Sequence, residues 1–89
     1  MKPDWATWKE MGKICKEQRY YKEADFCFEQ AAGMAPYAFQ NLIFEEMVEI
    51  SILLDDYDKS FKRINYLLKK NYKNCEMNLL KHYIYLQIK

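Results

Sequence analysis

Few residues of this sequence could carry catalysis, and their spacing does not suit it. His82 is the single histidine, so any general-base arrangement must be built around it. Cys75 precedes it by seven residues on the same face of an expected helix, which separates the two side chains by about 10 Å along the helix axis. A nucleophile must lie within ~2.6–3.2 Å of its base, so this pair does not form a catalytic dyad.

The remaining cysteines and the acidic residues have ordinary structural interpretations. Cys15 and Cys27 fall on the two helices of one expected pair, where a thiol usually acts as a small buried apolar group. Glu45 and Glu49 are one helical turn apart and could form a paired-carboxylate site, although a solvated face opposite neighbouring lysines is the commoner arrangement. No His/Cys spacing fits zinc, and the two glycines are isolated. The sequence therefore predicts no enzyme activity, no cofactor and no metal site.

Length and composition narrow the fold class. The chain has 89 residues, of which 51% are hydrophobic and 17% aromatic, with two Gly and two Pro. This length corresponds to one domain, and the composition excludes a disordered or collagenous chain. So few turn residues also argue against a β-sandwich or barrel.

Charge and cysteine usage bear on location and partners. The net charge is +1, which gives no global attraction to nucleic acid or to an anionic membrane. Three cysteines without a CxxC pair, no signal-peptide core and no apolar run of about 20 residues favour a reducing, cytoplasmic environment and no transmembrane segment. The charge is nevertheless uneven, because residues 37–58 carry only acids and residues 59–89 carry mostly bases.

Helical periodicity extends over nearly the whole sequence. Apolar residues recur every three or four positions, Asp4 is placed to cap a first helix, and Gly33 with Pro36 reads as a helix stop. We expect five helices, at about residues 4–17, 20–33, 38–53, 57–70 and 74–88.

The helical pattern repeats with a period of 36 residues. A shift of 36 places Trp8 on Phe44, Met11 on Met47 and Ile14 on Ile50. Repetition at this period is typical of solenoids built from helical pairs. The sequence predicts a single domain, 1–89, made of repeat one (3–36), repeat two (37–72) and a fifth helix (73–89).

The first repeat resembles the tetratricopeptide repeat family. The residues that carry the resemblance are Trp8, Met11, Gly12, Cys15, Ala24, Phe28, Ala31 and Pro36. The resemblance implies an all-α solenoid of two helix-turn-helix hairpins followed by the fifth helix. Gly12 and Ala24 should be small because the two helices cross there, with Trp8, Met11 and Phe28 filling the space beside the crossing. The second repeat keeps the apolar pattern but lacks the Gly, the Ala and the closing Pro.

The segment from Tyr21 to Gln30, together with Trp8 and Pro36, looks like one particular branch of this family. It is similar to the cytosolic tetratricopeptide subunit (subunit 2) of the endoplasmic reticulum membrane protein complex, and Phe26 with Cys27 carries the match. That resemblance implies a non-catalytic scaffold, peripheral on the cytosolic face of the endoplasmic reticulum. It would bind other protein subunits, including cytosolic parts of membrane proteins, in a complex that inserts membrane proteins. Because proteins of that family are several times longer, this chain would be a fragment or a reduced version.

The repeat register predicts which side chains line a concave partner-binding face formed by the first helix of each pair. They are Lys9, Lys13, Lys16, Leu42, Glu45, Glu49, Ile52, Lys81, Tyr85 and Ile88. Signs alternate along this face, so neighbouring helices can neutralise each other. Glutamates on the central helix disfavour the carboxylate-ended peptides that some co-chaperones of this family bind, whereas Leu42, Ile52, Ile88 and Tyr85 suit an apolar segment or helix.

Two other functions stay open at this point. A free adaptor or co-chaperone could bind a peptide or helix in the same groove. An RNA-binding helical repeat could use the basic stretch that runs from Lys59 to Lys73, with its interleaved tyrosines, although such a stretch is usually a solvated outer face. The crowded apolar residues 83–88 indicate that another helix or subunit covers the fifth helix, so we expect the isolated chain to self-associate.

Overall fold

The computed structural model describes residues 3–70, 80–81, 83–85 and 87, and these residues form an all-α structure. Its main helices are α1 (Trp5–Glu17), α2 (Tyr21–Met34), α3 (Tyr37–Leu53) and α4 (Tyr57–Lys69). Residues 80–81, 83–85 and 87 are also helical. The all-α class is confirmed, and each of the first four helices begins and ends within one residue of its predicted bounds. Much of the predicted fifth helix, including Ile88, lies outside the described residues.

Aspartates cap two of these helices, and the cap at Asp4 is the one that the sequence predicts. The Asp4 carboxylate accepts a hydrogen bond from the backbone N–H of Thr7 at 2.8 Å, and this bond lowers the pKa of Asp4. Asp56 caps α4 in the same way, by accepting from the backbone N–H of Lys59 at 3.2 Å. Each carboxylate satisfies an amide that has no partner within its helix.

The turn between α1 and α2 and the turn between α3 and α4 have the same backbone structure. In the first, Tyr20 N–H donates to the Cys15 carbonyl at 2.8 Å, while Arg19 has a φ of 66°. In the second, Asp56 N–H donates to the Ser51 carbonyl at 2.9 Å, while Asp55 has a φ of 58°. Both turns are Schellman motifs with a left-handed residue just past the helix. Equivalent residues are 36 apart, the period of the sequence pattern.

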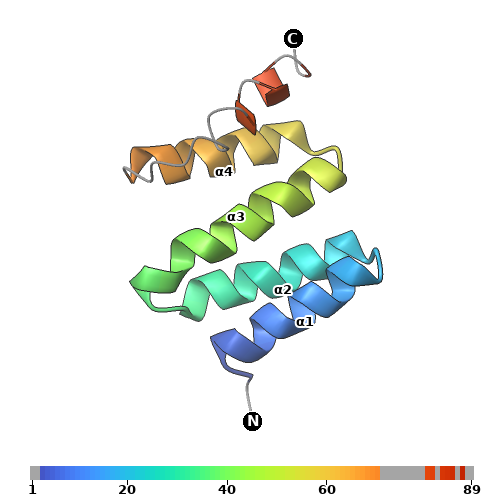
Figure 1. Cartoon of the computed structure of the whole chain (residues 1–89), viewed down its shortest axis with the longest axis vertical. Coiled ribbons are helices and arrows are strands. Elements are labelled where there is room, and N and C mark those ends of the chain that lie inside the picture. The colour runs from blue at the N-terminus through green and yellow to red at the C-terminus, as the bar shows by residue number, and fades with distance from the viewer. Residues whose placement is uncertain (1–2, 71–79, 82, 86, 88–89) are drawn as a thin grey trace.

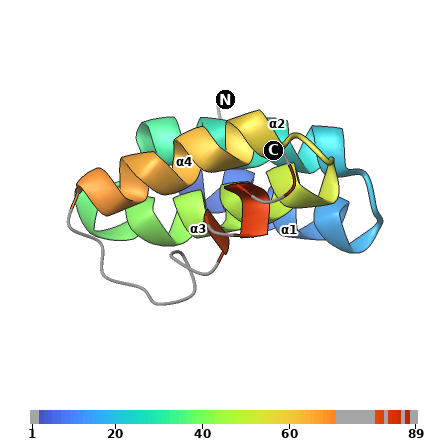
Figure 2. The ribbon, with the colours of Figure 1, turned by 90° about the horizontal axis from the view of Figure 1, so that it is seen from above.

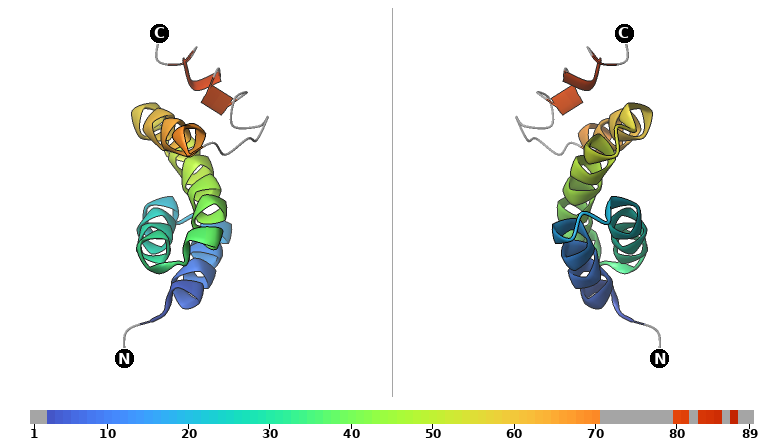
Figure 3. Two further views of the ribbon diagram at one scale, coloured as in Figure 1. Left: turned by 90° about the vertical axis from the view of Figure 1, so that its left-hand side faces the viewer. Right: turned by 90° about the vertical axis from the view of Figure 1, so that its right-hand side faces the viewer.

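The four helices pack in succession, each against the next (Figure 1). Seen from above, α2 and α4 form one layer and α1 and α3 form the other (Figure 2). The two side views show the same two-layer stack, with the described residues 80–81, 83–85 and 87 beyond α3 and α4 (Figure 3).

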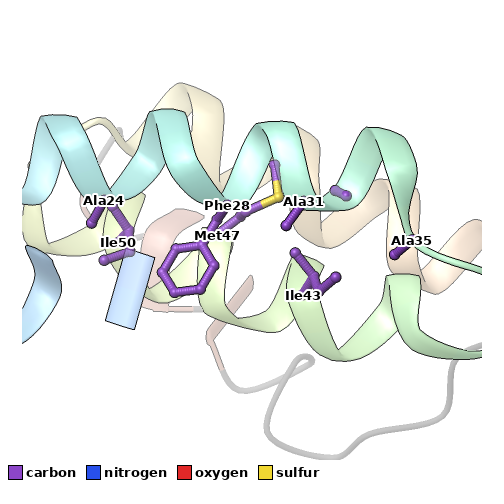
Figure 4. Packing of buried hydrophobic residues seen from close by; sticks show 8 residues of the cluster. Ala24, Phe28, Ala31, Ala35, Ile43, Met47 and Ile50 are labelled. Atoms are coloured by element: carbon purple, nitrogen blue, oxygen red, sulfur yellow. The ribbon is translucent and has the colours of Figure 1, made fainter. Parts of the chain in front are cut away.

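The first apolar cluster joins α2 to α3 (Figure 4) and is sealed by α1. Ala24 and Phe28 are fully buried in it. A β-carbon added to Gly12 would lie 3.0 Å from the Phe28 ring, so a small residue is needed at Gly12, where the Phe28 side chain fills the space between the helices. The prediction for Met11 was wrong, because this side chain is 39% exposed and leaves the crossing to Phe28.

The second apolar cluster joins α3 to α4 and to residue 84. It consists of Val48, Ile64, Leu67 and Ile84, all fully buried. Ile84 therefore attaches the helical residues near the C-terminus to the second hairpin. Tyr83 and Tyr85, on either side of it, are about half exposed, at 47% and 48%.

Within the described residues, no helix combines the length and the apolar character needed to cross a membrane. The longest of them, α3, carries glutamates at its centre.

Candidate protein-binding groove

Lysines of α1 face glutamates of α3 across the layer that these helices share. The Lys16 ammonium lies 2.9 Å from Glu49 and 3.2 Å from Glu46. Burial lowers the pKa of Lys16, but the hydrogen bonds and charges of the two glutamates outweigh it and hold the pKa above its ordinary value. Opposite charges therefore pair across this face, but the register pairs Glu49 with Lys13 rather than with Lys16. Each half-exposed pair of this kind adds only about 0–1 kcal/mol to stability.

A pocket of about 210 Å³ lies between the N-terminal halves of α1 and α3. Trp5 stacks on Phe39 with ring centroids 5.0 Å apart, and the Lys9 ammonium lies 5.8 Å from the centre of the Trp5 ring. Leu42, on the rim, is 58% exposed. The full lining is Trp5, Lys9, Lys13, Phe39, Leu42, Ile43, Glu45 and Glu46. The pocket thus combines an aromatic wall, an exposed aliphatic side chain and charges of both signs.

A second pocket, of about 300 Å³, continues along the same two helices. It is lined by Lys13, Lys16, Glu17, Tyr21, Glu46 and Leu53. Lys13 and Glu46 line both pockets. We refer to the two pockets together as the α1–α3 groove.

The α1–α3 groove gathers six of the ten residues predicted to bind a partner. Lys9, Lys13, Lys16, Leu42 and Glu45 line its pockets, and Glu49 joins through Lys16.

The other four predicted residues lie elsewhere. Ile52 is partly buried and packs against the second apolar cluster. The Lys81 ammonium lies 5.5 Å from the centre of the Phe61 ring, on α4. Tyr85 is 48% exposed, and Ile88 lies outside the described residues. The face predicted from the register is therefore continuous across α1 and α3, and Lys81 turns toward α4.

Seven residues that line the groove were missed by the sequence analysis: Trp5, Glu17, Tyr21, Phe39, Ile43, Glu46 and Leu53. Phe39 precedes Leu42 by one helical turn, and Trp5 precedes Lys9 by one turn. That spacing could have placed both aromatics on the predicted face. Their contact joins residues 34 positions apart, and a comparison made at 36 residues does not align them.

A buried ionic cluster lies on the other layer, between α2 and α4. Arg63 is only 7% exposed, and its guanidinium donates to both carboxylate oxygens of Asp25, at 2.7 and 3.1 Å. It also donates to the Met47 carbonyl at 2.6 Å and to Glu29 at 2.9 Å. Lys59 adds a contact to Asp25 at 3.2 Å. The interpretation of this basic stretch as a solvated outer face is therefore wrong for Arg63, which joins the two hairpins.

The charges of the ionic cluster compensate one another. Burial raises the pKa of Asp25, but hydrogen bonds and charges from Arg63 and Lys59 outweigh it and hold the pKa below its ordinary value of 3.8. A pocket of about 440 Å³ lies beside the cluster, and its lining includes Phe44 and Tyr66. The rings of these two residues are stacked, with their centroids 4.7 Å apart. The cations here already have carboxylate partners, so this pocket does not present a free positive surface.

The described residues hold no group of three or more His, Cys, Asp or Glu that could bind a metal ion. His82 and Cys75, the pair considered for catalysis, lie outside them. Comparison of the chain with protein families, curated proteins and solved structures finds no match.

Proposed function

We propose that this protein is a non-catalytic interaction scaffold of the tetratricopeptide type, and that its α1–α3 groove binds a segment of a partner protein. The observation that carries the proposal is the composition of this groove. Phe39 and Leu42 are 45% and 58% exposed there, and lysines and glutamates surround them. An apolar centre within a charged rim is the usual anatomy of a protein interface.

The repeat assignment within this proposal is supported by the backbone as well as by the signature residues. The two Schellman turns are equivalent at a spacing of 36 residues. The contact between Gly12 and Phe28 matches the small and large positions of the repeat pattern. An array of such pairs presents the first helices of successive repeats on one face, and α1 and α3 share such a layer.

In its finer form, the proposal is that the chain is the cytosolic subunit, or part of it, of an endoplasmic reticulum complex that inserts membrane proteins. The residues from Tyr21 to Gln30 support this identity. The partner would then be a cytosolic segment of an integral membrane protein, with an apolar side chain seated against Phe39 and Leu42.

Photo-crosslinking in cells tests the proposal directly. A photoreactive residue replaces Leu42 in the full chain, and a control chain carries it at Lys62, which is exposed on α4. We expect crosslinks from position 42, and not from position 62, to cytosolic segments of integral membrane proteins. Recovery of soluble chaperones alone would favour the adaptor function, and equal recovery at both positions would exclude the groove as the interface.

A pair of substitutions measures the contribution of the groove. Leu42→Arg places a charge in the apolar centre and should reduce partner recovery by about tenfold or more, as expected for a central interface residue. Met34→Arg is the matched control, because Met34 is 45% exposed on α2, outside the groove. Equal losses in both variants would contradict a specific role for Leu42.

RNA binding is the remaining alternative, and the ionic cluster argues against it. Lys59 and Arg63, two of the bases in that stretch, contact Asp25 and Glu29. Salt-dependent RNA binding that is lost on replacing Lys62 and Lys69 would reverse this conclusion.

A further inference from the structure

Cys15 of α1 and Cys27 of α2 form a pair of facing thiols that the proposed function does not use. Both are free cysteines, and the Cys15 thiol lies close enough to Cys27 to contribute to the raised pKa of that residue. Cys27 is 6% exposed, whereas Cys15 is partly buried at the edge of the first apolar cluster. The pair therefore has one reachable sulfur and one enclosed sulfur.

The two helices are held close together around these thiols. Gly12 lies one turn before Cys15 and has no β-carbon, which lets the Phe28 ring approach α1 closely. A β-carbon added to Gly12 would lie 3.0 Å from that ring. Phe28 directly follows Cys27 in α2. The Schellman turn fixes the helices from the other side, because Tyr20 N–H donates to the carbonyl of Cys15 itself.

The second hairpin shows that this position reaches across to the neighbouring helix. Ser51 is the residue 36 positions after Cys15. Its hydroxyl accepts a hydrogen bond from Ser60 of α4 at 2.7 Å, with both side chains fully buried. Ser60 is the equivalent of Ala24, and Cys15 likewise packs against the cluster that contains Ala24 and Phe28. In both hairpins, therefore, the side chain at this register position packs against the second helix of its pair.

We propose that Cys15 and Cys27 form a reversible intramolecular disulfide when the protein meets an oxidised low-molecular-weight disulfide such as oxidised glutathione. Cys15 gives up its proton to water, and its thiolate attacks one sulfur of glutathione disulfide. The S–S bond of that molecule breaks, and glutathione leaves as a thiolate. Cys27 then loses its proton and attacks the Cys15 sulfur of the mixed disulfide, and a second glutathione thiolate leaves. Two protein thiols are oxidised and one glutathione disulfide is reduced to two thiols, so atoms and electrons balance.

The order of attack follows from the surroundings of each thiol. Burial raises the pKa of Cys27, and the neighbouring Cys15 and Glu23 act in the same direction. The reactive species is the thiolate, so the enclosed sulfur is the poorer first nucleophile. Cys15, at the edge of the cluster, is therefore the attacking thiol, and Cys27 is the resolving thiol. The resulting bond would tie α1 to α2 and fix the α1 side of the groove.

The test uses the full folded chain with Cys75→Ser, which removes the third thiol. After incubation with oxidised glutathione, we expect the intact mass to fall by two hydrogen atoms, with no glutathione retained. Digestion without reductant should yield one linked peptide pair containing Cys15 and Cys27, which a dithiol reductant separates. A folded chain that stays fully reduced, or that retains one glutathione on Cys15 while Cys27 stays free, would overturn the proposal.

Two further variants test the order of the steps. In the Cys75→Ser background, Cys27→Ser should accumulate the mixed disulfide at Cys15, because the resolving thiol is missing. Cys15→Ser should react at least about tenfold more slowly at its remaining thiol. Equal rates in the two variants would contradict the assignment of Cys15 as the attacking thiol.

Thermal unfolding checks that the native hairpin accommodates the bond. A cross-link that closes a loop of this size stabilises the folded chain, so the midpoint of the oxidised chain should rise by about 5 °C or more. A lower midpoint after oxidation would show that the bond forms only by distorting the hairpin, which contradicts the proposal.

Discussion

The two helical hairpins have the same turn but hold their helices together by different means. In the first, Gly12 leaves the space on α1 that the buried Phe28 ring of α2 fills. In the second, the residues 36 positions after Gly12, Ala24 and Phe28 are Val48, Ser60 and Ile64. There a buried hydrogen bond from the Ser60 hydroxyl of α4 to the Ser51 hydroxyl of α3 joins the two helices.

The two hairpins also differ at the position of Cys27 in the first and Arg63 in the second, which are 36 residues apart. Cys27 is a buried thiol in the first hairpin, whereas Arg63, its equivalent in the second, is a buried guanidinium paired with Asp25. One hairpin thus depends on shape, which added volume disrupts. The other depends on paired polar groups, which become costly when a partner is lost; for Arg63 that partner, Asp25, lies on α2 of the first hairpin. Substitutions of opposite kinds should therefore be most damaging in the two hairpins.

The largest effect is expected from Asp25→Asn. This change leaves the Arg63 charge buried with its main partner neutralised, and removing one member of a buried ion pair costs about 3–5 kcal/mol. The free energy of unfolding, measured in urea, should fall by that amount, whereas Glu23→Gln, at an exposed acid on the same helix, should leave it within about 0.5 kcal/mol. A loss below about 1 kcal/mol for Asp25→Asn would show that Arg63 does not depend on this carboxylate.

The Asp25 contribution should also depend on pH. Its pKa is lowered in the folded chain, so the carboxylate stabilises the fold above its ordinary pKa of 3.8, and this stability is lost as the pH falls through the lower folded value. The difference in unfolding free energy between the native chain and Asp25→Asn should be constant from pH 7 down to about pH 5 and should shrink below pH 3.8. A difference that does not change down to pH 2 would contradict the assigned charge on Asp25.

Gly12→Val places in the first hairpin the residue that the second one carries. The new side chain must enter the space of the Phe28 ring, and overpacking of this kind costs about 1–3 kcal/mol. The matched control is Gly33→Ala on α2, where an added β-carbon meets nothing within 4 Å. Its helix propensity should raise the unfolding free energy by about 0.5 kcal/mol. Equal effects of the two variants would contradict the steric account of the first hairpin.

Much of the fold could be predicted from the sequence because its determinants are local. Asp4 and Asp56 cap helices that begin within three residues of them, and the apolar periodicity defines the helices between. The 36-residue register also predicts that lysines of the first helix face glutamates of the third, although it pairs Glu49 with Lys13 and Lys16 with Ile52, one helical turn away from the contact that forms. These signals depend on short separations or on the period itself.

The contacts that sequence analysis missed have neither property. Arg63 and Asp25 are 38 residues apart, and the ladder of equivalent positions does not relate them. From the sequence, an arginine within a basic stretch is expected to be exposed. Only the structure shows that Arg63 is enclosed by the Met47 carbonyl and the Asp25 carboxylate. Trp5 and Phe39 are likewise out of register, and their stacking depends on how α1 crosses α3.

Ser60→Ala tests the polar side of the comparison at a smaller scale. The change gives the second hairpin the alanine that the first one carries at the equivalent position, Ala24. It removes the buried hydrogen bond to Ser51, so the free energy of unfolding should fall by about 0.5–1.5 kcal/mol. The Ser51 hydroxyl still donates to the Val48 carbonyl at 2.8 Å, so its donor is not left without a partner. The double change with Ser51→Ala should cost less than the sum of the two single changes, because it removes both partners together. Additive losses would show that the two hydroxyls do not interact.

The smallest effect is expected at the feature that the two hairpins share. Arg19 and Asp55 hold left-handed backbone conformations, with φ of 66° and 58°, in a position where Gly carries no steric penalty. Arg19→Gly and Asp55→Gly should each raise the free energy of unfolding by up to about 1 kcal/mol. Asp55 also accepts a hydrogen bond from the Tyr57 hydroxyl at 3.1 Å, so its gain should be the smaller. Urea unfolding of both variants measures this difference, and a loss of stability at Arg19 would show that its side chain contributes more than its backbone strain costs.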